Sequence, residues 1–229
     1  MKVAIVTGSS GNMGQAVVKK FIDEGYYVIG TVIPNDHVTI DFPADKFEKV
    51  AIDLADENEA QKFIDSVISK HGSVDAAILT VGGFAMGKIA DTKIADINKQ
   101  YNLNFETTYN IARPVFLQML KQNGGRIFVI GSRPGLNSIF SKGMIAYGLA
   151  KSLIFRLAEL MNEEAKGKNV VTSVVVPSTI DTPINRESMP NAKFDDWVKP
   201  EEIADTIYWH CTTEASVLRE PVIKVYGNA

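Results

Sequence analysis

The sequence predicts an α/β protein with a doubly wound, mostly parallel sheet and helices on both of its faces. Along the 229 residues, short β-branched runs alternate with segments whose apolar residues recur with a helical period. The short runs are almost continuously apolar, which is typical of strands buried on both faces. A glycine-rich turn joins the first run to the first helical segment. These observations indicate a Rossmann fold.

Seven runs are predicted to be strands, and four of the intervening segments carry a clear helical stripe. The strands are expected at residues 3–7, 27–32, 49–52, 76–80, 126–130, 170–176 and 222–226. The stripes predict helices around residues 13–21, 60–68, 105–119 and 150–161. Because parallel strands need right-handed crossovers, an open sheet covered on both sides is the simplest arrangement.

A single domain is expected over residues 1–229. No linker rich in Pro, Gly or Ser, no repeat and no block of like charge divides the chain. The longest stretch without periodicity, residues 182–200, contains three prolines. We expect it to be a substrate loop with a short helix over the carboxyl edge of the sheet, where ligands of such sheets bind.

The composition argues against several kinds of partner. The 24 basic and 27 acidic residues are spread along the chain, so neither nucleic acid nor an acidic membrane has a basic surface to bind. No run of 18 apolar residues occurs, and the apolar N-terminal run is too short for a signal peptide. Cys211 is the single cysteine, and the scattered His37, His71 and His210 do not suggest a metal site. We therefore expect a cytoplasmic protein without bound metal.

The turn after the first strand has the composition of a phosphate-binding loop. A pyrophosphate needs a tight turn, a backbone without Cβ atoms in the way and a helix N-terminus. Gly8, Gly11 and Gly14 meet these needs, and Ser10 and Met13 of the same loop are included as expected cofactor contacts. An ordinary strand-to-helix turn is the alternative, since a glycine triplet alone is weak evidence.

The end of the second strand bears on the choice between NAD and NADP. An acid there binds the ribose 2′-hydroxyl, whereas a 2′-phosphate prefers a basic partner. The strand ends at Thr31 and Val32 without an acid, and Thr31 is an expected cofactor contact. Asp36 lies close enough to keep NAD possible, and no arginine is nearby. The sequence favours NADP over NAD.

A tyrosine, a lysine and a serine form the candidate catalytic set. Tyr147 and Lys151 are four residues apart and share one helical face. A nearby ammonium favours phenolate, which would lower the pKa of Tyr147 and suit it to acid–base work. Ser132 follows the fifth strand, where it is placed to hydrogen-bond a substrate carbonyl. The alternatives are a plain surface contact for the pair and an N-cap for the serine.

With these residues, the sequence resembles the short-chain dehydrogenases/reductases from the Thr7-Gly8 loop to Val225-Tyr226-Gly227. The resemblance implies hydride transfer between NAD or NADP and a carbonyl or alcohol carbon. It assigns Tyr147 as the acid/base, Lys151 as its pKa partner and a ribose ligand, and Ser132 as the carbonyl anchor. It also points to Asn104, with Asn102 as its local competitor, as the residue that holds a proton-relay water.

The resemblance implies further cofactor contacts, although each also has a structural explanation. These residues are Asp53 and Leu54 after the third strand, Gly82 and Gly83 after the fourth, and Pro177, Ile180 and Thr182 at or after the sixth. Asp53 is equally suited to entering a helix, the glycines to forming a turn and the last three to packing a loop.

Three departures from the family pattern stand out. The glycines follow Gly-x-x-Gly-x-x-Gly, with the second displaced by one position. Thr80-Val81-Gly82-Gly83 replaces the usual Asn-Asn-Ala-Gly and resembles dihydropteridine-reductase-like members. The gap from Ser132 to Tyr147 is about two residues longer than usual, so Ser138 or Ser141 is an alternative to Ser132.

The substrate is expected to be a small carbonyl or alcohol compound. Phe84 and Met86 are expected beside the nicotinamide, and Arg133, Asn185 and Arg186 either meet a polar or anionic substrate or are solvated. Extra apolar surface on residues 97–121 and 146–166 predicts a homodimer or homotetramer, as in similar family members. A catalytically silent nucleotide-binding sensor is the alternative function.

Overall fold

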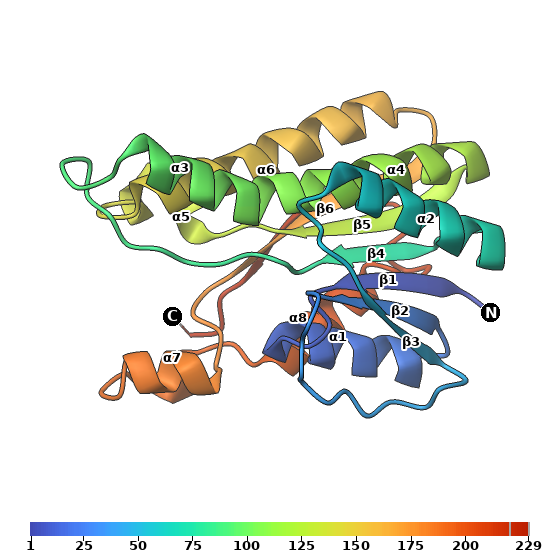
Figure 1. The fold of residues 1–229 in the computed structure, drawn as a ribbon, viewed down its shortest axis with the longest axis horizontal. Coiled ribbons are helices and arrows are strands. Elements are labelled where there is room, and N and C mark those ends of the chain that lie inside the picture. The colour runs from blue at the N-terminus through green and yellow to red at the C-terminus, as the bar shows by residue number, and fades with distance from the viewer. Residues whose placement is uncertain (220, 229) are drawn as a thin grey trace.

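A parallel sheet lies between two layers of helices in the computed structural model, which describes residues 1–219 and 221–228 (Figure 1). The strands are β1 (Val3–Thr7), β2 (Tyr27–Val32), β3 (Phe47–Ala51), β4 (Ala76–Leu79), β5 (Gly124–Ile130), β6 (Asn169–Pro177) and β7 (Val222–Val225). They form one 7-stranded sheet in the order β3-β2-β1-β4-β5-β6-β7, and every described pairing is parallel. The predicted doubly wound fold is confirmed.

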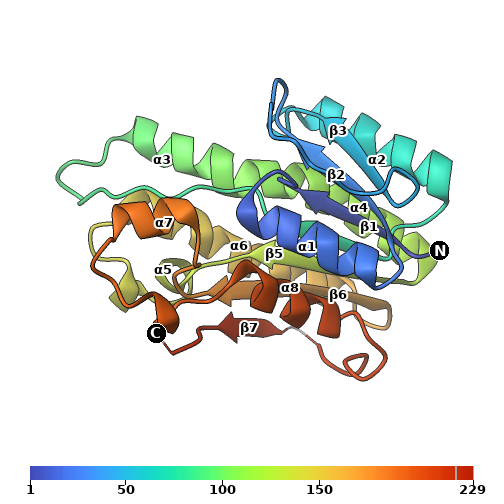
Figure 2. The same ribbon diagram turned by 90° about the horizontal axis from the view of Figure 1, so that it is seen from below.

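The long helices divide between the two faces of the sheet. The helix α1 (Asn12–Asp23) and α8 (Pro200–Trp209) cover one face, and α2 (Glu57–His71), α4 (Thr107–Gln122) and α6 (Ile145–Glu164) cover the other (Figure 1). The helix α3 (Ile94–Tyr101) continues into α4 through a π-helical turn, Asn102–Glu106. Figure 2 shows α1 and α8 side by side over the sheet.

Two apolar cores explain why the strands read as continuous apolar runs. Side chains of a strand alternate between its faces, so Val3 and Ile5 of β1 join the core under α2, α4 and α6. Ala4 and Val6 join the core under α1 and α8. Both sets are at most 4% exposed. No polar face is available to the strand, and the pattern of period two disappears from the sequence.

The strand order reverses between β1 and β4, which lie next to each other although they are distant in sequence. The loops after these strands therefore start side by side at the carboxyl edge and then diverge, leaving the crevice where ligands of such sheets bind. The segments that follow β5 and β6 reach the same edge. Most of the sequence-predicted site residues lie in or directly beside these loops. The exceptions are Thr31 in β2, Asp53 and Leu54 after β3, Asn104 in the π-helical turn, and Tyr147 and Lys151 in α6.

The predicted substrate loop contains two short helical pieces. They are α7 (Pro183–Ser188) and a 3₁₀ turn, Phe194–Asp196. A parallel bridge between Ile180 and Val198 closes the base of the loop, supported by a hydrogen bond from Asp181 N–H to the Val198 carbonyl. After β5 come another short helix, α5 (Arg133–Leu136), and a 3₁₀ turn, Ser138–Phe140. Among the described helices, none is long and apolar enough to cross a membrane.

Asn162 of α6 completes the hydrogen bonding of the sheet where β6 extends beyond β7. Among the residues that the structure describes, the pairing of β6 with β7 begins at Val174, and none of them pairs with Thr172 on that side. The Asn162 amide instead donates to the Thr172 carbonyl and accepts from its N–H, both at 2.8 Å. The side chain reproduces the two bonds that a neighbouring strand would make.

We expect Asn162→Ala to lower the free energy of unfolding by about 2–4 kcal/mol, because it leaves two buried backbone groups without partners. Urea denaturation would measure this loss. Asn58→Ala, on the exposed surface of α2, is the matched control and should change the unfolding free energy by less than about 0.5 kcal/mol. An Asn162 variant as stable as the control would contradict the assigned role.

Candidate active site

The glycine loop after β1 depends on a close contact between two of its glycines. Gly8 adopts a φ of +64°, in the region that favours glycine. A Cβ on Gly14 would lie 2.1 Å from the Gly8 carbonyl oxygen, so a side chain at Gly14 would force the loop apart. The Gly11 N–H donates to that same oxygen at 3.0 Å. The three glycines therefore form one tight turn despite their unusual spacing.

The N-terminus of α1 is open to an anion. Gly11 occupies the N-cap position and supplies no side-chain cap, and the first turn contains no acid. The N–H groups of a first helical turn have no partner within the helix, and the helix dipole favours negative charge at this end. This arrangement fits the pyrophosphate of a nicotinamide dinucleotide, for which Gly8, Gly11, Gly14, Ser10 and Met13 were predicted.

Thr31 supports the loop and does not line it. Its side chain is 1% exposed, and its carbonyl accepts hydrogen bonds from the Ser9 N–H at 2.9 Å and the Ser9 hydroxyl at 3.1 Å. The Thr31 side chain is enclosed by the strands on either side of β2, and its role as a cofactor contact stays a prediction. Ser9, which the sequence did not single out, is the buried residue that ties β2 to the loop.

Asp36 lies against the glycine loop. The Ser10 hydroxyl donates to its carboxylate, and the Val38 N–H donates to the other carboxylate oxygen at 2.7 Å. The hydrogen bond from Ser10, followed by that from Val38, lowers the pKa of Asp36. An ionised carboxylate is thus held beside the loop, although it lies four residues beyond the end of β2.

Ser132 and Tyr147 meet at the carboxyl end of β5. Ser132 is 6% exposed, and its hydroxyl is hydrogen-bonded to Tyr147. The same oxygen caps α5 by accepting from the Gly135 N–H at 3.1 Å. Ser141 instead donates to the Pro134 carbonyl at 2.6 Å, and Ser138 is exposed. The longer gap is absorbed by α5 and the following 3₁₀ turn, so Ser132 remains the serine beside Tyr147.

Lys151 is buried and bonded to the sheet. The residue is 5% exposed, and its ammonium donates to the Ile130 carbonyl at 2.7 Å. Burial lowers the pKa of Lys151 to about 8. Burial also raises the pKa of Tyr147, and the hydrogen bond from Ser132 opposes this only in part. The expected lowering of the Tyr147 pKa by Lys151 is therefore wrong for this structure, because desolvation dominates.

Asn104 reaches the site from the π-helical turn between α3 and α4. Its side chain is fully buried, while Asn102 is exposed. The amide accepts from the Gly83 N–H at 3.1 Å and donates to the Gly83 carbonyl at 3.0 Å. A Cβ on Gly82 would lie 2.7 Å from Asn104 Oδ1 and 3.2 Å from Lys151 Nζ. The segment after β4 therefore lies directly against both predicted catalytic side chains, and the π-helical turn follows a pattern common at functional sites.

Gln100 is a site residue that the sequence did not reveal. It is 4% exposed, and its side-chain and backbone carbonyls both accept from Asn104 Nδ2 at 3.1 Å. Its position one helical turn before Asn104 is the signal that would have found it, since residues four apart on a helix are neighbours. Gln100 fixes the orientation of the Asn104 amide.

The other predicted cofactor residues occupy the same edge with different accessibility. Asp53 is exposed and accepts from the Ala55 N–H at 3.0 Å, while the Leu54 side chain belongs to the core. Pro177 ends β6, and Thr182 caps α7 by accepting from the Asn185 N–H at 3.3 Å. Ile180 is half-buried at the bridge to Val198. The Leu54 side chain is turned into one core, and Ile180 packs against the other.

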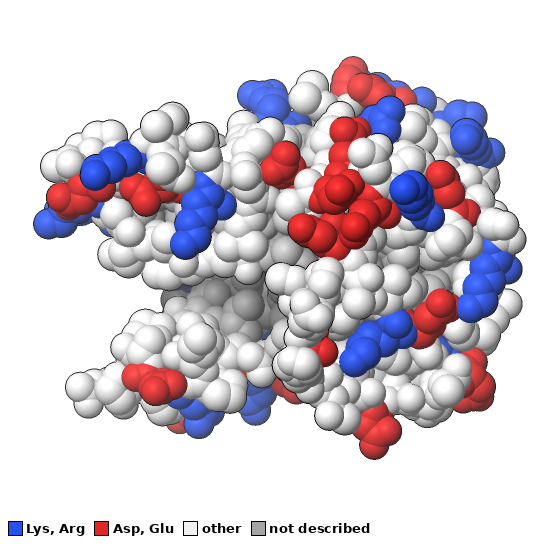
Figure 3. Space-filling view, viewed as in Figure 1, with Lys and Arg blue, Asp and Glu red and all other residues white. Residues whose placement is uncertain are grey.

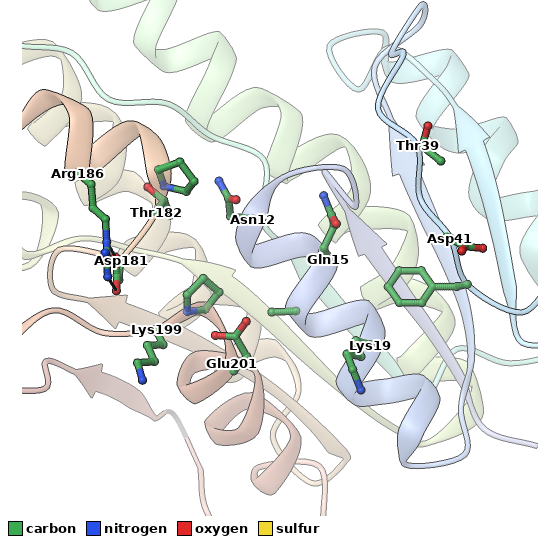
Figure 4. A pocket seen from close by; sticks show the side chains of 14 residues that line it. Asn12, Gln15, Lys19, Thr39, Asp41, Asp181, Thr182, Arg186, Lys199 and Glu201 are labelled. Carbon is green, nitrogen blue, oxygen red and sulfur yellow. Dashed lines mark hydrogen bonds and ion pairs between the residues drawn. The ribbon is translucent and has the colours of Figure 1, made fainter. Parts of the chain in front are cut away.

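A pocket of about 860 Å³ opens beside the glycine loop (Figure 4). It is lined by one face of α1, the segment after β2 and the start of α7 and α8. Its side chains include Asn12, Gln15, Lys19, Thr39, Asp41, Asp181, Thr182, Arg186, Lys199 and Glu201. Asn12 and Thr182 place it next to the glycine loop and the expected cofactor contacts after β6, whereas Tyr147 is not among its lining residues. A separate hollow lies between α7 and the segments above it in Figure 3.

Comparison with known proteins identifies the family. A family model described as short chain dehydrogenase matches residues 2–193. The chain belongs to the short-chain dehydrogenase family. It is 23% identical to 3-oxoacyl-[acyl-carrier-protein] reductase FabG of Thermotoga maritima, over 99% of this chain and 97% of the relative. It is 28% identical to dihydropteridine reductase of Dictyostelium discoideum, over 97% and 94% respectively.

The solved structure of aldohexose dehydrogenase from Thermoplasma acidophilum matches the same fold. Its TM-score is 0.83 at 23% identity, over 99% of this chain and 93% of that one. Family membership makes this short-chain dehydrogenase an NAD(P)-dependent oxidoreductase, as predicted. The alternative of a catalytically silent sensor finds no support among these relatives.

The burial of Lys151 predicts how stability depends on pH. Its folded-state pKa of about 8 lies below the ordinary lysine pKa of 10.5, so the unfolded chain holds more protons between these pH values. The folded state therefore gains stability as pH rises through this window. We expect wild type to gain about 3 kcal/mol relative to Lys151→Met between pH 7 and pH 10.5.

Urea midpoints at several pH values would measure this difference, with Lys168→Met as an exposed control that should follow the wild-type pH dependence. If the unfolding free energies of wild type and Lys151→Met changed in parallel with pH, the Lys151 ammonium would not be desolvated in the folded state.

Proposed function

We propose that this enzyme reduces a small carbonyl compound, with Tyr147 as the general acid and NADPH as the preferred hydride donor. The observation that carries the proposal is the hydrogen bond between Ser132 and Tyr147 at the carboxyl edge, one helical turn from the buried Lys151. The names of two relatives, a 3-oxoacyl reductase and a dihydropteridine reductase, support reduction as the reaction class.

The two hydroxyl groups have complementary tasks. A bound nicotinamide supplies the hydride to the carbonyl carbon. Ser132 donates a hydrogen bond to the carbonyl oxygen and so stabilises the charge that develops there. Tyr147 delivers a proton to the same oxygen. Because burial raises its pKa, Tyr147 is protonated at neutral pH, which is the state that reduction requires.

Lys151 and Asn104 restore the proton after each turnover. Lys151 lies one turn from Tyr147 with a pKa of about 8, so it can gain or lose a proton near neutral pH. Asn104 is held rigidly by Gln100 and Gly83, next to Lys151. We assign to Asn104 the role of holding a relay water. We assign to Lys151 the transfer of the proton and a hydrogen bond to a ribose hydroxyl of the cofactor.

The cofactor choice is set at the end of β2. The absence of an acid within β2 favours NADP. Asp36 itself opposes a 2′-phosphate, because its carboxylate is held against Ser10. We assign Asp36 as the group that limits the preference for NADP and keeps NAD usable.

A homodimer through α4 and α6 belongs to the same proposal. These helices expose large apolar side chains on the side away from the sheet. They are Tyr109, Leu117, Leu149, Leu153 and Leu160, exposed by 38–55%. Such a patch on outer helices is typical of a subunit contact.

The test of the function is Tyr147→Phe, assayed by NADPH oxidation with a panel of ketones, aldehydes and quinones. We expect kcat to fall at least about a hundredfold, since general acid catalysis contributes 10²–10⁴-fold, while the Kd for NADPH changes little. Nicotinamide fluorescence measures that Kd. Turnover at the wild-type rate in this variant would remove Tyr147 from the mechanism.

The cofactor assignment has its own variant. Asp36→Ala removes a carboxylate from the region of the 2′-phosphate, so we expect the ratio of NADH to NADPH dissociation constants to rise about tenfold. Fluorescence titration with both nucleotides measures the ratio. Asp41→Ala removes a neighbouring exposed carboxylate and should leave it unchanged. If the two substitutions changed the ratio equally, the net charge of the region, and not the position of Asp36, would set the cofactor preference.

A further inference from the structure

We propose that the substrate is a neutral carbonyl compound with an aromatic or bulky apolar group next to the reacting carbon. The inference rests on the proposed function of Tyr147 and names the substrate class that this site admits. It is carried by the side chains around Tyr147 and by the pairing of the arginines that an anionic substrate would need.

An exposed aromatic ring stands directly beside Tyr147. Phe84 lies edge to face against the Tyr147 ring, with centroids 5.1 Å apart and planes at 76°. Phe84 is nevertheless 62% exposed, so most of its surface is available to a ligand. An aromatic group of the substrate, bound next to the reacting carbon, can cover the Phe84 ring. The complex then gains buried apolar area and a contact between two rings.

The segment that carries Phe84 is fixed to the helix that carries Tyr147. The Gly87 N–H donates to the Gly143 carbonyl at 2.7 Å, and the Ile145 N–H donates to the Gly87 carbonyl at 3.1 Å. Met86 lies against Gly143 and is 67% exposed. These two apolar side chains are thus held in place beside the catalytic group.

The helix α7, which follows β6, also exposes apolar side chains and borders the hollow in Figure 3. Ile184 is 70% exposed and Met189, just after α7, is 40% exposed. Figures 1 and 2 both place α7 beside the carboxyl edge of the sheet. Several exposed apolar groups at one edge of a sheet are typical of a site for an apolar ligand.

The two arginines of this region already have partners inside the protein. Arg186 makes a bidentate ion pair with Asp181 at 2.5 and 2.7 Å, and its guanidinium lies 4.7 Å from the Phe194 ring centre. Arg133 lies over the Tyr226 ring at 4.1 Å and near that of Phe140 at 5.7 Å. Asn185 donates to the Ile180 carbonyl at 2.8 Å. A substrate carboxylate would have to displace Asp181 from Arg186, so a neutral substrate is favoured at this guanidinium.

The experiment compares three diketones in the NADPH assay: 1-phenylpropane-1,2-dione, its para-carboxylate derivative and butane-2,3-dione. We expect kcat/KM for the phenyl dione to exceed that of its carboxylate by at least about tenfold. Phe84→Ala should lower kcat/KM for the phenyl dione about tenfold, equivalent to about 1.4 kcal/mol, and that for butanedione less than threefold. Phe84→Leu should restore part of the loss.

Val217→Ala removes an apolar side chain that is 80% exposed outside the hollow, and it should match wild type with all three compounds. Calorimetric titration of the phenyl dione and its carboxylate into the complex with NADP⁺ separates binding from turnover.

Binding of the phenyl dione that depends on Phe84, without turnover of any compound, would support the substrate class and overturn the proposed reaction. Turnover of the carboxylate at least as efficient as that of the phenyl dione would overturn the substrate class and leave the reaction standing. Failure of the phenyl dione both to bind and to react would overturn the substrate class.

Discussion

The close contact between α6 and the turn after β5 is the constraint on which the catalytic site depends. A Cβ on Gly135 would lie 2.7 Å from the Lys151 carbonyl carbon and Cβ, so α5 can approach α6 only because this residue has no side chain. The Lys151 ammonium bonds the Ile130 carbonyl at the end of β5. Together these contacts fix the rotation and height of α6 against the sheet. Tyr147, one turn earlier, is thereby held beside Ser132, which follows the same strand.

This contact has an electrostatic cost that explains the state of both ionisable groups. Tyr147 and Lys151 are both largely withdrawn from water, which raises the pKa of the first and lowers that of the second. Each shift favours the neutral form. The protein therefore gives up part of its stability at neutral pH to keep an ammonium inside the fold. Such a cost is expected where function, and not packing, decides which residue is buried.

The fold and the candidate catalytic residues could be predicted from the sequence because both depend on local patterns, although the catalytic roles stay predictions. Continuous apolar runs identified all seven strands, and the helical spacing of Tyr147 and Lys151 placed them on one face. Tertiary contacts decided what remained. The direction of the Lys151 ammonium depends on the Ile130 carbonyl of another element, and Thr31 is buried by neighbouring strands. Asp36 reaches Ser10 across a turn that contains Asn35 at a positive φ, which no periodicity reveals.

The site combines a fixed edge with walls that the fold does not determine. The edge consists of strand ends and helix starts tied by short hydrogen bonds, and it supplies Ser132, Tyr147 and Lys151. The walls come from the segments after β4 and β6, where side chains such as Phe84 and Ile184 are largely exposed and contribute little to the core. This division is consistent with the relatives, whose names include a 3-oxoacyl reductase and a dihydropteridine reductase on the same family framework. The reaction class is therefore a property of the edge, and the substrate is a property of the walls.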